Sequence, residues 1–289
     1  MHTLDIPRPA VAAVAPMRTI SSGGVDIPVL GLGTYQLGGE VGSDLVATAI
    51  GAGYRHIDTA TMYGNEAEVG AGIRMSGVPR DELFVTTKIW FDRLEPDDFV
   101  RATEASLARL GLDRLDLLLV HWPNRAVPLA RTMPALAGLK RRGLTRAIGV
   151  ANFPSTLLRE AMAACDEPVA TDQVEFHPYL DQTRLLMAAR DLGVALTAYR
   201  PLGHGNLITE PVVTEIARAH GATPAQIALA WSLNHPGVVV IPKTAHAERL
   251  QENLGALALT LTADEMARIA ALARPDGRQV NPAFAPVWD

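Results

Sequence analysis

The sequence predicts an α/β protein, a (β/α)8 TIM barrel with an N-terminal β-hairpin and a C-terminal extension. Short apolar, β-branched runs alternate with amphipathic stretches of about 10 to 15 residues, a pattern typical of βαβ units. Eight such runs follow one another without an obvious linker. An open doubly wound sheet is the alternative, but its GxGxxG fingerprint is missing because Gln36 stands where the third glycine belongs. The runs span residues 28–34, 54–58, 83–88, 115–121, 146–152, 169–175, 194–199 and 238–243.

The chain before the first run divides into two parts. Residues 1–16 contain three prolines and no regular period, so we expect a flexible leader with Met17 as a second candidate for the initiator. Residues 17–28 predict a β-hairpin that turns at Gly23–Gly24. Helices are expected between the runs, for example at 97–112 and 224–235, where apolar residues recur three and four apart. We therefore expect residues 17–289 to form a single barrel domain.

Composition excludes several classes of function. With 26 Lys and Arg against 31 Asp and Glu, the net charge of −5 offers no basic surface for nucleic acid or an anionic membrane. No apolar run approaches the roughly 20 residues of a membrane-spanning helix. The single cysteine, Cys165, cannot build a disulfide framework, and the histidines show no metal-ligand spacing. These features predict a cytoplasmic protein without a metal, and we expect a monomer.

Polar residues stand at the ends of several apolar runs. One such residue alone is usually a cap or a structural side chain. In a barrel, however, all parallel strands end on the same C-terminal face, where active sites of this fold are assembled. We therefore expect these side chains to meet there. They are Asp58, Lys88, His121, Asn152, Gln173 and Glu175.

Four residues form a constellation suited to carbonyl reduction. A Lys88 ammonium in a partly dry pocket needs a carboxylate partner, and Asp58 is the candidate. Tyr63 lies five residues beyond Asp58, and we expect the ammonium to lower the pKa of its phenol so that it can protonate a developing alkoxide. His121 can orient the substrate oxygen. Because no side chain donates hydride, the reaction requires a nicotinamide or flavin.

The residues at the end of the last apolar run and just after it predict which nicotinamide cofactor the protein uses. Lys243 and Arg249 supply two cations and Thr244 a hydroxyl, beside a predicted helix N-terminus, which suits the 2′-phosphate of NADPH or NADP+. The alternative for Arg249 and Glu252 is a solvated helix face with an i,i+3 ion pair.

Several blocks together resemble the aldo-keto reductase superfamily. They are GLGTYQL, YRHIDTATMYGNEAEVG, LFVTTKIW, LDLLLVHWP, GVANF, DQVEFHPYL, TAYRPLGHG and VVVIPKTAHAERLQEN. The order of D-x4-Y, a strand-end lysine and H-W-P is specific, and the tail NPAFAPVWD is similar to that of its bacterial 2,5-diketo-D-gluconate reductase B and methylglyoxal reductase branch.

The resemblance implies a role for each matching residue. It makes Tyr63 the general acid, tuned by Lys88 and Asp58, with His121 orienting the carbonyl. A list of the implied cofactor contacts comprises Thr34, Asp58, Asn152, Gln173, Tyr199, Arg200, Leu202, Lys243, Thr244, Arg249, Glu252 and Asn253. In this set Asn152 and Gln173 hold the carboxamide, Tyr199 stacks on the nicotinamide, and Glu252 and Asn253 contact the adenine.

Two residues depart from the family pattern. Ala151 and Arg200 stand where serine is common, so one hydroxyl contact is lost and a cation lies near the expected pyrophosphate path. Arg200 then either strengthens NADP binding or points to solvent.

The substrate site is expected to have aromatic walls. Trp90, Phe91 and Trp122 follow two of the catalytic runs directly, in loops that border a barrel's active site, and core packing is the alternative for them. Tyr35 is a fourth substrate residue implied by the resemblance.

These features favour an NADPH-dependent reductase of small aldehydes, α-dicarbonyls such as methylglyoxal, or keto sugars such as 2,5-diketogluconate. A nicotinamide-binding regulatory subunit with little turnover is the alternative, since such subunits can keep the same four residues. A metal-dependent barrel hydrolase would need His-x-His on the first strand, and GLGTY has none.

Overall fold

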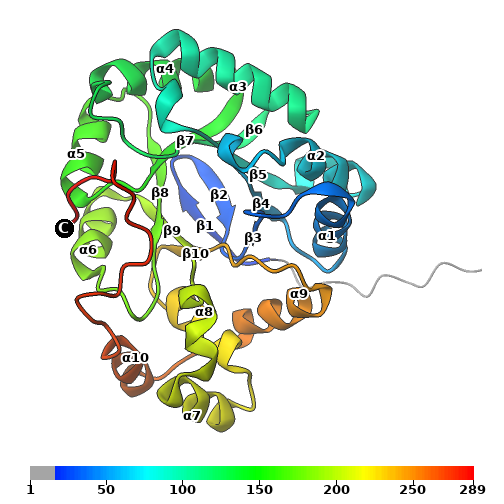
Figure 1. The fold of residues 1–289 in the computed structure, drawn as a ribbon, viewed down its shortest axis with the longest axis vertical. Helices are drawn as coiled ribbons and strands as arrows, with labels where there is room; N and C mark the ends of the chain where they lie inside the picture. Colours follow the sequence, from blue (N-terminus) through cyan, green and yellow to red (C-terminus); the bar gives the residue numbers. More distant parts are fainter. Residues whose placement is uncertain (1–16) are drawn as a thin grey trace, which may run out of the picture.

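The computed structural model describes residues 17–289, so the predicted leader at 1–16 lies outside the described residues. Eight parallel strands surround the centre of the molecule, paired in chain order (Figure 1). A parallel bridge between Leu30, two residues before the first strand, and Val240 in the last strand closes the ring, which confirms the predicted barrel. The strands are β3 (Leu32–Gly33), β4 (His56–Asp58), β5 (Phe84–Ile89), β6 (Leu115–Val120), β7 (Thr145–Ala151), β8 (Val169–Glu175), β9 (Ala195–Tyr199) and β10 (Val238–Val240).

The strands are buried on both faces, which explains why they read as unbroken apolar runs. Along β6, Leu117 and Leu119 point into the barrel, whereas Leu118 and Val120 pack against the outer helices. The same alternation in β5 puts Phe84 in the interior cluster and Lys88, four residues later, on the same inward face. The sheet therefore directs the lysine into the barrel.

Helices form the outer layer of the barrel (Figure 1). The helix predicted at 97–112 is α3, which begins at Pro96 and ends before Gly111, a glycine with φ of 66°. The helix predicted at 224–235 is α8, and Thr223 and Gln226 cap its first turn reciprocally. The helices are α1 (Gly39–Gly51), α2 (Glu66–Met75), α3 (Pro96–Leu110), α4 (Leu129–Arg141), α5 (Ser155–Ala163), α6 (Thr183–Leu192), α7 (Pro211–His220), α8 (Pro224–Leu233), α9 (Ala247–Leu254) and α10 (Ala263–Ala270). Shorter 3-10 turns are η1 (Thr61–Tyr63), η2 (Arg80–Glu82), η3 (Phe91–Arg93), η4 (Gly203–Thr209) and η5 (Gly255–Ala258).

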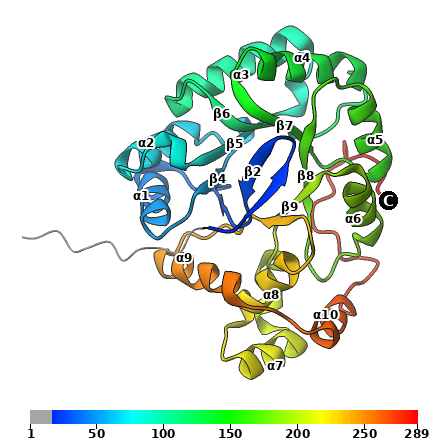
Figure 2. The ribbon, with the colours of Figure 1, turned by 180° about the vertical axis from the view of Figure 1, so that it is seen from behind.

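The predicted hairpin closes one end of the barrel. Strands β1 (Thr19–Ser22) and β2 (Val25–Pro28) pair in antiparallel fashion around Gly23–Gly24, where φ is positive at both residues. Figure 2 shows the hairpin lying across the ring of strands. Ser22 Oγ donates to Ala170 O at 2.7 Å, and Ile27 is buried in the interior cluster. The carboxyl ends of the strands are thus left as the open face.

The C-terminal extension is also confirmed. After α10 the chain runs from 271 to 289 without helix or strand and passes along α6 and α5 (Figure 1, red). We call residues 278–289 the C-terminal strap. In the described part of the chain, no helix is long and apolar enough to cross a membrane.

Candidate active site

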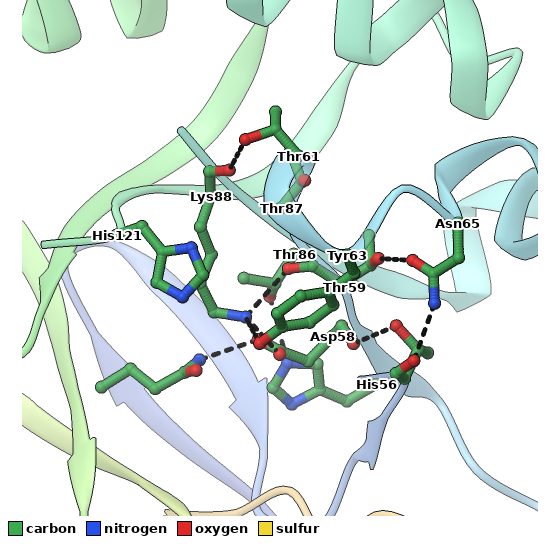
Figure 3. A network of polar contacts seen from close by, with 12 residues as sticks. His56, Asp58, Thr59, Thr61, Tyr63, Asn65, Thr86, Thr87, Lys88 and His121 are labelled. Carbon is green, nitrogen blue, oxygen red and sulfur yellow. Dashed lines mark hydrogen bonds and ion pairs between the residues drawn. The ribbon is translucent and has the colours of Figure 1, made fainter. Parts of the chain in front are cut away.

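The strand ends bring the predicted catalytic residues together at the open face. Asp58 ends β4, Lys88 is the penultimate residue of β5, and His121 follows β6. Tyr63 comes from η1, directly after β4 (Figure 3). The side chains of Asp58 and Lys88 are inaccessible to solvent, and His121 is only 6% exposed.

Lys88 is the centre of this polar cluster. Its Nζ donates to Asp58 Oδ1 at 2.5 Å, to the Thr59 carbonyl at 2.9 Å and to Tyr63 Oη at 3.3 Å (Figure 3). The second oxygen of Asp58 accepts from Gln173 Nε2 at 2.7 Å. A buried ammonium is tolerated when it is paired and hydrogen-bonded in this way. The expected contact between Lys88, Asp58 and Tyr63 is therefore present.

The net pKa of Tyr63 differs from the expectation. Burial of the phenol raises its pKa more than the Lys88 ammonium lowers it, so the net pKa lies above the ordinary value of 10.0. The effect of the ammonium was predicted correctly, but the net direction was wrong because desolvation was left out. The phenol consequently holds its proton at neutral pH.

The charge states of the two neighbours follow from the same balance. Burial lowers the pKa of Lys88, but Asp58 and Tyr63 more than compensate, and the net pKa is raised. Burial, together with the Lys88 charge, lowers the pKa of His121 well below its usual 6.5. At pH 7 the lysine is therefore charged and the imidazole neutral. His121 Nδ1 has no hydrogen-bond partner among the described residues.

Buried hydrogen bonds hold the loop that carries Tyr63. Asn65 donates from Nδ2 to the carbonyls of Thr34 and Leu37, both at 2.7 Å, and accepts from Thr59 Oγ1 at 2.8 Å. Thr61 Oγ1 donates to the Lys88 carbonyl at 3.0 Å. Sequence reasoning assigned no role to Asn65, although it lies within the quoted block YGNE.

The predicted substrate residues form a wall of rings. Tyr35, 43% exposed, meets Tyr63 edge-on at a centroid distance of 5.1 Å. Trp90 lies 4.8 Å from the His121 ring and 5.3 Å from that of Phe91. Trp122 is buried beneath the C-terminal strap, so packing contributes to its position.

Two further members of this wall come from the strap and were missed. Phe284 stacks on Phe91 at 4.3 Å and meets Trp122 at 5.5 Å, and Trp288 meets Trp122 at 6.0 Å. The only signal in the sequence was the presence of two large rings in the short segment NPAFAPVWD. We call these six rings the aromatic wall; they belong to Tyr35, Trp90, Phe91, Trp122, Phe284 and Trp288.

The strand-end residues predicted to hold the nicotinamide are linked to one another. Asn152, at a φ of 64°, donates to the His121 carbonyl at 2.9 Å and accepts from Tyr199 Oη at 2.7 Å. Gln173 is bonded to Asp58, as described above, and Thr34 Oγ1 donates to the Asp58 carbonyl at 2.9 Å. These contacts set the positions of the amides relative to the catalytic cluster.

The residues predicted to bind the remainder of the dinucleotide lie farther out. Lys243 is exposed in the connection after β10, Arg249 is exposed in the first turn of α9, and the Thr244 hydroxyl accepts from His246 N at 3.0 Å. Arg200 and Leu202 are partly exposed after β9.

Glu252 and Asn253, the two residues of α9 expected near the adenine, contact other side chains of the protein. The alternative interpretation paired Glu252 with Arg249, but in the described residues its carboxylate accepts from Thr223 Oγ1 at 2.6 Å. Asn253 is buried against Tyr54.

Glu175 does not join the catalytic cluster, although it stands at a strand end. Its buried carboxylate accepts from the backbone N–H groups of Gln279 at 2.6 Å and Val280 at 2.8 Å, and from His177 Nε2 at 2.9 Å. The expectation that all strand-end polar residues meet was therefore wrong for Glu175. Its role is to fix the start of the C-terminal strap.

The sequence and the fold of the chain both match those of known proteins. The model of the Aldo/keto reductase family matches residues 29–274. Methylglyoxal reductase DkgB of Yersinia pestis is 44% identical, over 92% of this chain and 100% of that protein. A crystal structure described as that of a candidate 2,5-diketo-D-gluconic acid reductase B is 46% identical with a TM-score of 0.92, over 94% of this chain and 98% of the other. The thermostable aldo-keto reductase Tm1743, solved with the inhibitor epalrestat, is 41% identical with a TM-score of 0.84, over 88% and 99%. The chain therefore belongs to the aldo/keto reductase family.

Proposed function

We propose that this chain is an NADPH-dependent reductase of small aldehydes, α-dicarbonyls such as methylglyoxal, or keto sugars such as 2,5-diketogluconate. The observation that carries the proposal is the buried Lys88 ammonium, bonded at once to Asp58 and to the Tyr63 hydroxyl beside a neutral His121. The names of the Yersinia relative and of the matched crystal structure support the substrate classes. A cytoplasmic location, a monomeric state and a single domain over 17–289 belong to the same proposal.

The donor set at the open face fits a nicotinamide dinucleotide. Asn152 and Gln173 present amides beside the Tyr199 ring, and Lys243 and Arg249 present exposed cations for a 2′-phosphate. When bound, the reduced nicotinamide supplies the hydride.

The residues of the chain supply the proton and the orientation. Neutral His121 donates one N–H to the carbonyl oxygen and fixes its direction. Tyr63, which keeps its proton at neutral pH, gives it to that oxygen as negative charge develops there. The phenolate that remains lies next to the Lys88 ammonium, which stabilises it, while Asp58 keeps the lysine charged and in place.

The direct test follows NADPH oxidation across a panel of carbonyl compounds. The panel contains methylglyoxal, 2,5-diketogluconate, aromatic aldehydes and aldoses. Turnover of at least one class by the wild-type protein supports the proposal. If NADPH binds but no member is reduced, the enzyme assignment is wrong and the regulatory subunit becomes the better interpretation.

The pH profile of reduction follows from the pKa directions. A raised pKa keeps the proton on Tyr63 into the alkaline range, and a lowered pKa keeps His121 neutral below its usual range. We expect kcat/KM for reduction to stay flat between about pH 6.5 and about pH 9. Initial rates in constant-ionic-strength buffers measure it. A rise or fall of kcat/KM inside this pH window would show that another titratable group, or a different charge state of Tyr63 or His121, controls the reaction.

The cofactor preference tests the assignment of the two cations. Lys243→Met combined with Arg249→Ala removes two charge-assisted contacts and should reduce the preference for NADPH over NADH by roughly 2 to 4 kcal/mol. The ratio of kcat/KM for the two cofactors measures it. Arg142→Ala, which removes a surface arginine paired with Glu104 at 2.7 Å, is the control for a general loss of positive charge. An unchanged ratio in the double variant would refute the 2′-phosphate assignment.

A further inference from the structure

Arg278, the first residue of the C-terminal strap, places its guanidinium next to Trp288 in the aromatic wall. The guanidinium carbon of Arg278 lies 3.7 Å from the centroid of the Trp288 ring. Trp288 contacts Trp122, and Trp122 contacts Phe284, which in turn lies 5.9 Å from Trp90. Since Trp90 packs on His121, a continuous line of rings joins Arg278 to the residues around the reacting carbonyl.

Arg278 has an unsatisfied donor. Its Nη1 is buried, yet forms no hydrogen bond within residues 17–289. A buried guanidinium N–H without an acceptor is costly, and structures generally supply a partner for it. The side-chain oxygen of the next residue, Gln279 Oε1, is buried without a partner as well, whereas the remainder of the Arg278 side chain is partly exposed and can be reached by a ligand.

The carboxylates near Arg278 are committed to other donors. Glu175 and Asp289 lie close enough for their charges to act on the guanidinium. Glu175 is bonded to the backbone of Gln279 and Val280 and to His177. Both side-chain oxygens of Asp289 accept from Ser155, one from its N–H at 2.7 Å and one from its hydroxyl at 2.6 Å.

The strap around Arg278 is fixed at both ends. The Glu175 contacts hold the two residues that follow Arg278, and the Ser155 contacts hold the last residue of the chain. The Trp288 ring covers one side of the guanidinium and contributes no hydrogen-bond acceptor to it. The planar fork of a guanidinium matches a carboxylate in a bidentate arrangement.

We propose that Arg278 is a specificity-determining residue that binds the carboxylate of an anionic substrate whose carbonyl lies at Tyr63 and His121. This inference rests on the proposed function. It assigns to the protein a preference for keto acids and aldehyde acids over neutral carbonyl compounds of the same size. The other anion that Arg278 can meet at this face is a phosphate of the cofactor, and the experiment separates the two.

The test compares an acid with its neutral ester. Wild type, Arg278→Met and Arg278→Lys are assayed with 4-formylbenzoate, with its methyl ester, and with the pair 2,5-diketogluconate and methylglyoxal. We expect Arg278→Met to lose about 10- to 100-fold in kcat/KM for the acids, mainly through KM, and to change less than about twofold for the neutral compounds. Arg278→Lys, which keeps the charge but lacks the fork, should lose less.

Arg274→Met is the matched control. Arg274 precedes the strap and also lies over a ring, that of Tyr179 at 4.7 Å, but it does not belong to the aromatic wall. This variant should keep the acid-to-ester ratio of the wild type. Melting temperatures of all variants identify any general loss of folding.

Each remaining outcome has a distinct meaning. An equal loss for acid and ester would overturn the inference, and a parallel loss of NADPH affinity in a fluorescence titration would assign Arg278 to the cofactor phosphate instead. If the wild type reduces none of the four compounds, the proposed function fails. Calorimetric binding of 4-formylbenzoate, weakened about 10-fold or more by Arg278→Met, would still support Arg278 as a carboxylate site, and equal binding would refute it.

Discussion

Tyr63→Phe should lower kcat for carbonyl reduction by about 10²- to 10⁴-fold while NADPH affinity stays nearly unchanged. The substitution removes only the hydroxyl that donates the proton, and the ring keeps its edge contacts with Tyr35 and His121. Lys88 loses one contact at 3.3 Å but keeps those with Asp58 and Thr59. Single-turnover reduction and a fluorescence titration with NADPH measure the two quantities separately.

Tyr35→Phe is the control for this experiment. It removes a hydroxyl from the neighbouring ring, which is exposed and is not among the hydrogen-bond partners of Lys88 in the described structure. We expect a change of less than about tenfold in kcat, since this ring only borders the substrate. Equal turnover by wild type and Tyr63→Phe would show that the proton comes from elsewhere.

Much of the fold was predictable because the barrel strands are covered on both faces. The run 115–121 corresponds to β6 and the run 169–175 to β8, because continuous apolar sequence is what such strands require. The hairpin was predictable from Gly23–Gly24, since few other residues adopt positive φ at two successive positions. These features are local, and the sequence carries them directly.

The contacts of the C-terminal strap were not predictable in the same way. Phe284 and Trp288 belong to a segment without regular structure, whose path depends on the distant carboxylate of Glu175 and on Ser155. No periodicity in NPAFAPVWD indicates which strand ends it meets. The same limit applies to Glu175, whose position at a strand end suggested chemistry but whose carboxylate is bonded to His177 and to two backbone N–H groups more than 100 residues away.

The pKa of Tyr63 shows a second limit. The attraction between an ammonium and a phenolate is implied once Lys88 and Tyr63 are neighbours, and the structure contains that contact. The larger effect, burial of the phenol, depends on everything packed around it. Sequence identifies the partners of a titratable group more readily than the solvent that they exclude.

Lys88→Met should lower both activity and stability, and it separates the two roles of the buried pair. Without the ammonium, Asp58 keeps only Gln173 and loses its charge partner in a site closed to solvent, so unfolding free energy should fall by about 3 to 5 kcal/mol. Adding Asp58→Asn removes the uncompensated charge, and the double variant should recover most of that stability while kcat stays low, because no cation stabilises the Tyr63 phenolate.

Urea unfolding and steady-state kinetics of the wild type, both single variants and the double variant complete the cycle. If the double variant is as unstable as Lys88→Met, loss of packing rather than an unpaired charge explains the instability; if its kcat recovers with its stability, Lys88 acts only in folding and not on the proton of Tyr63.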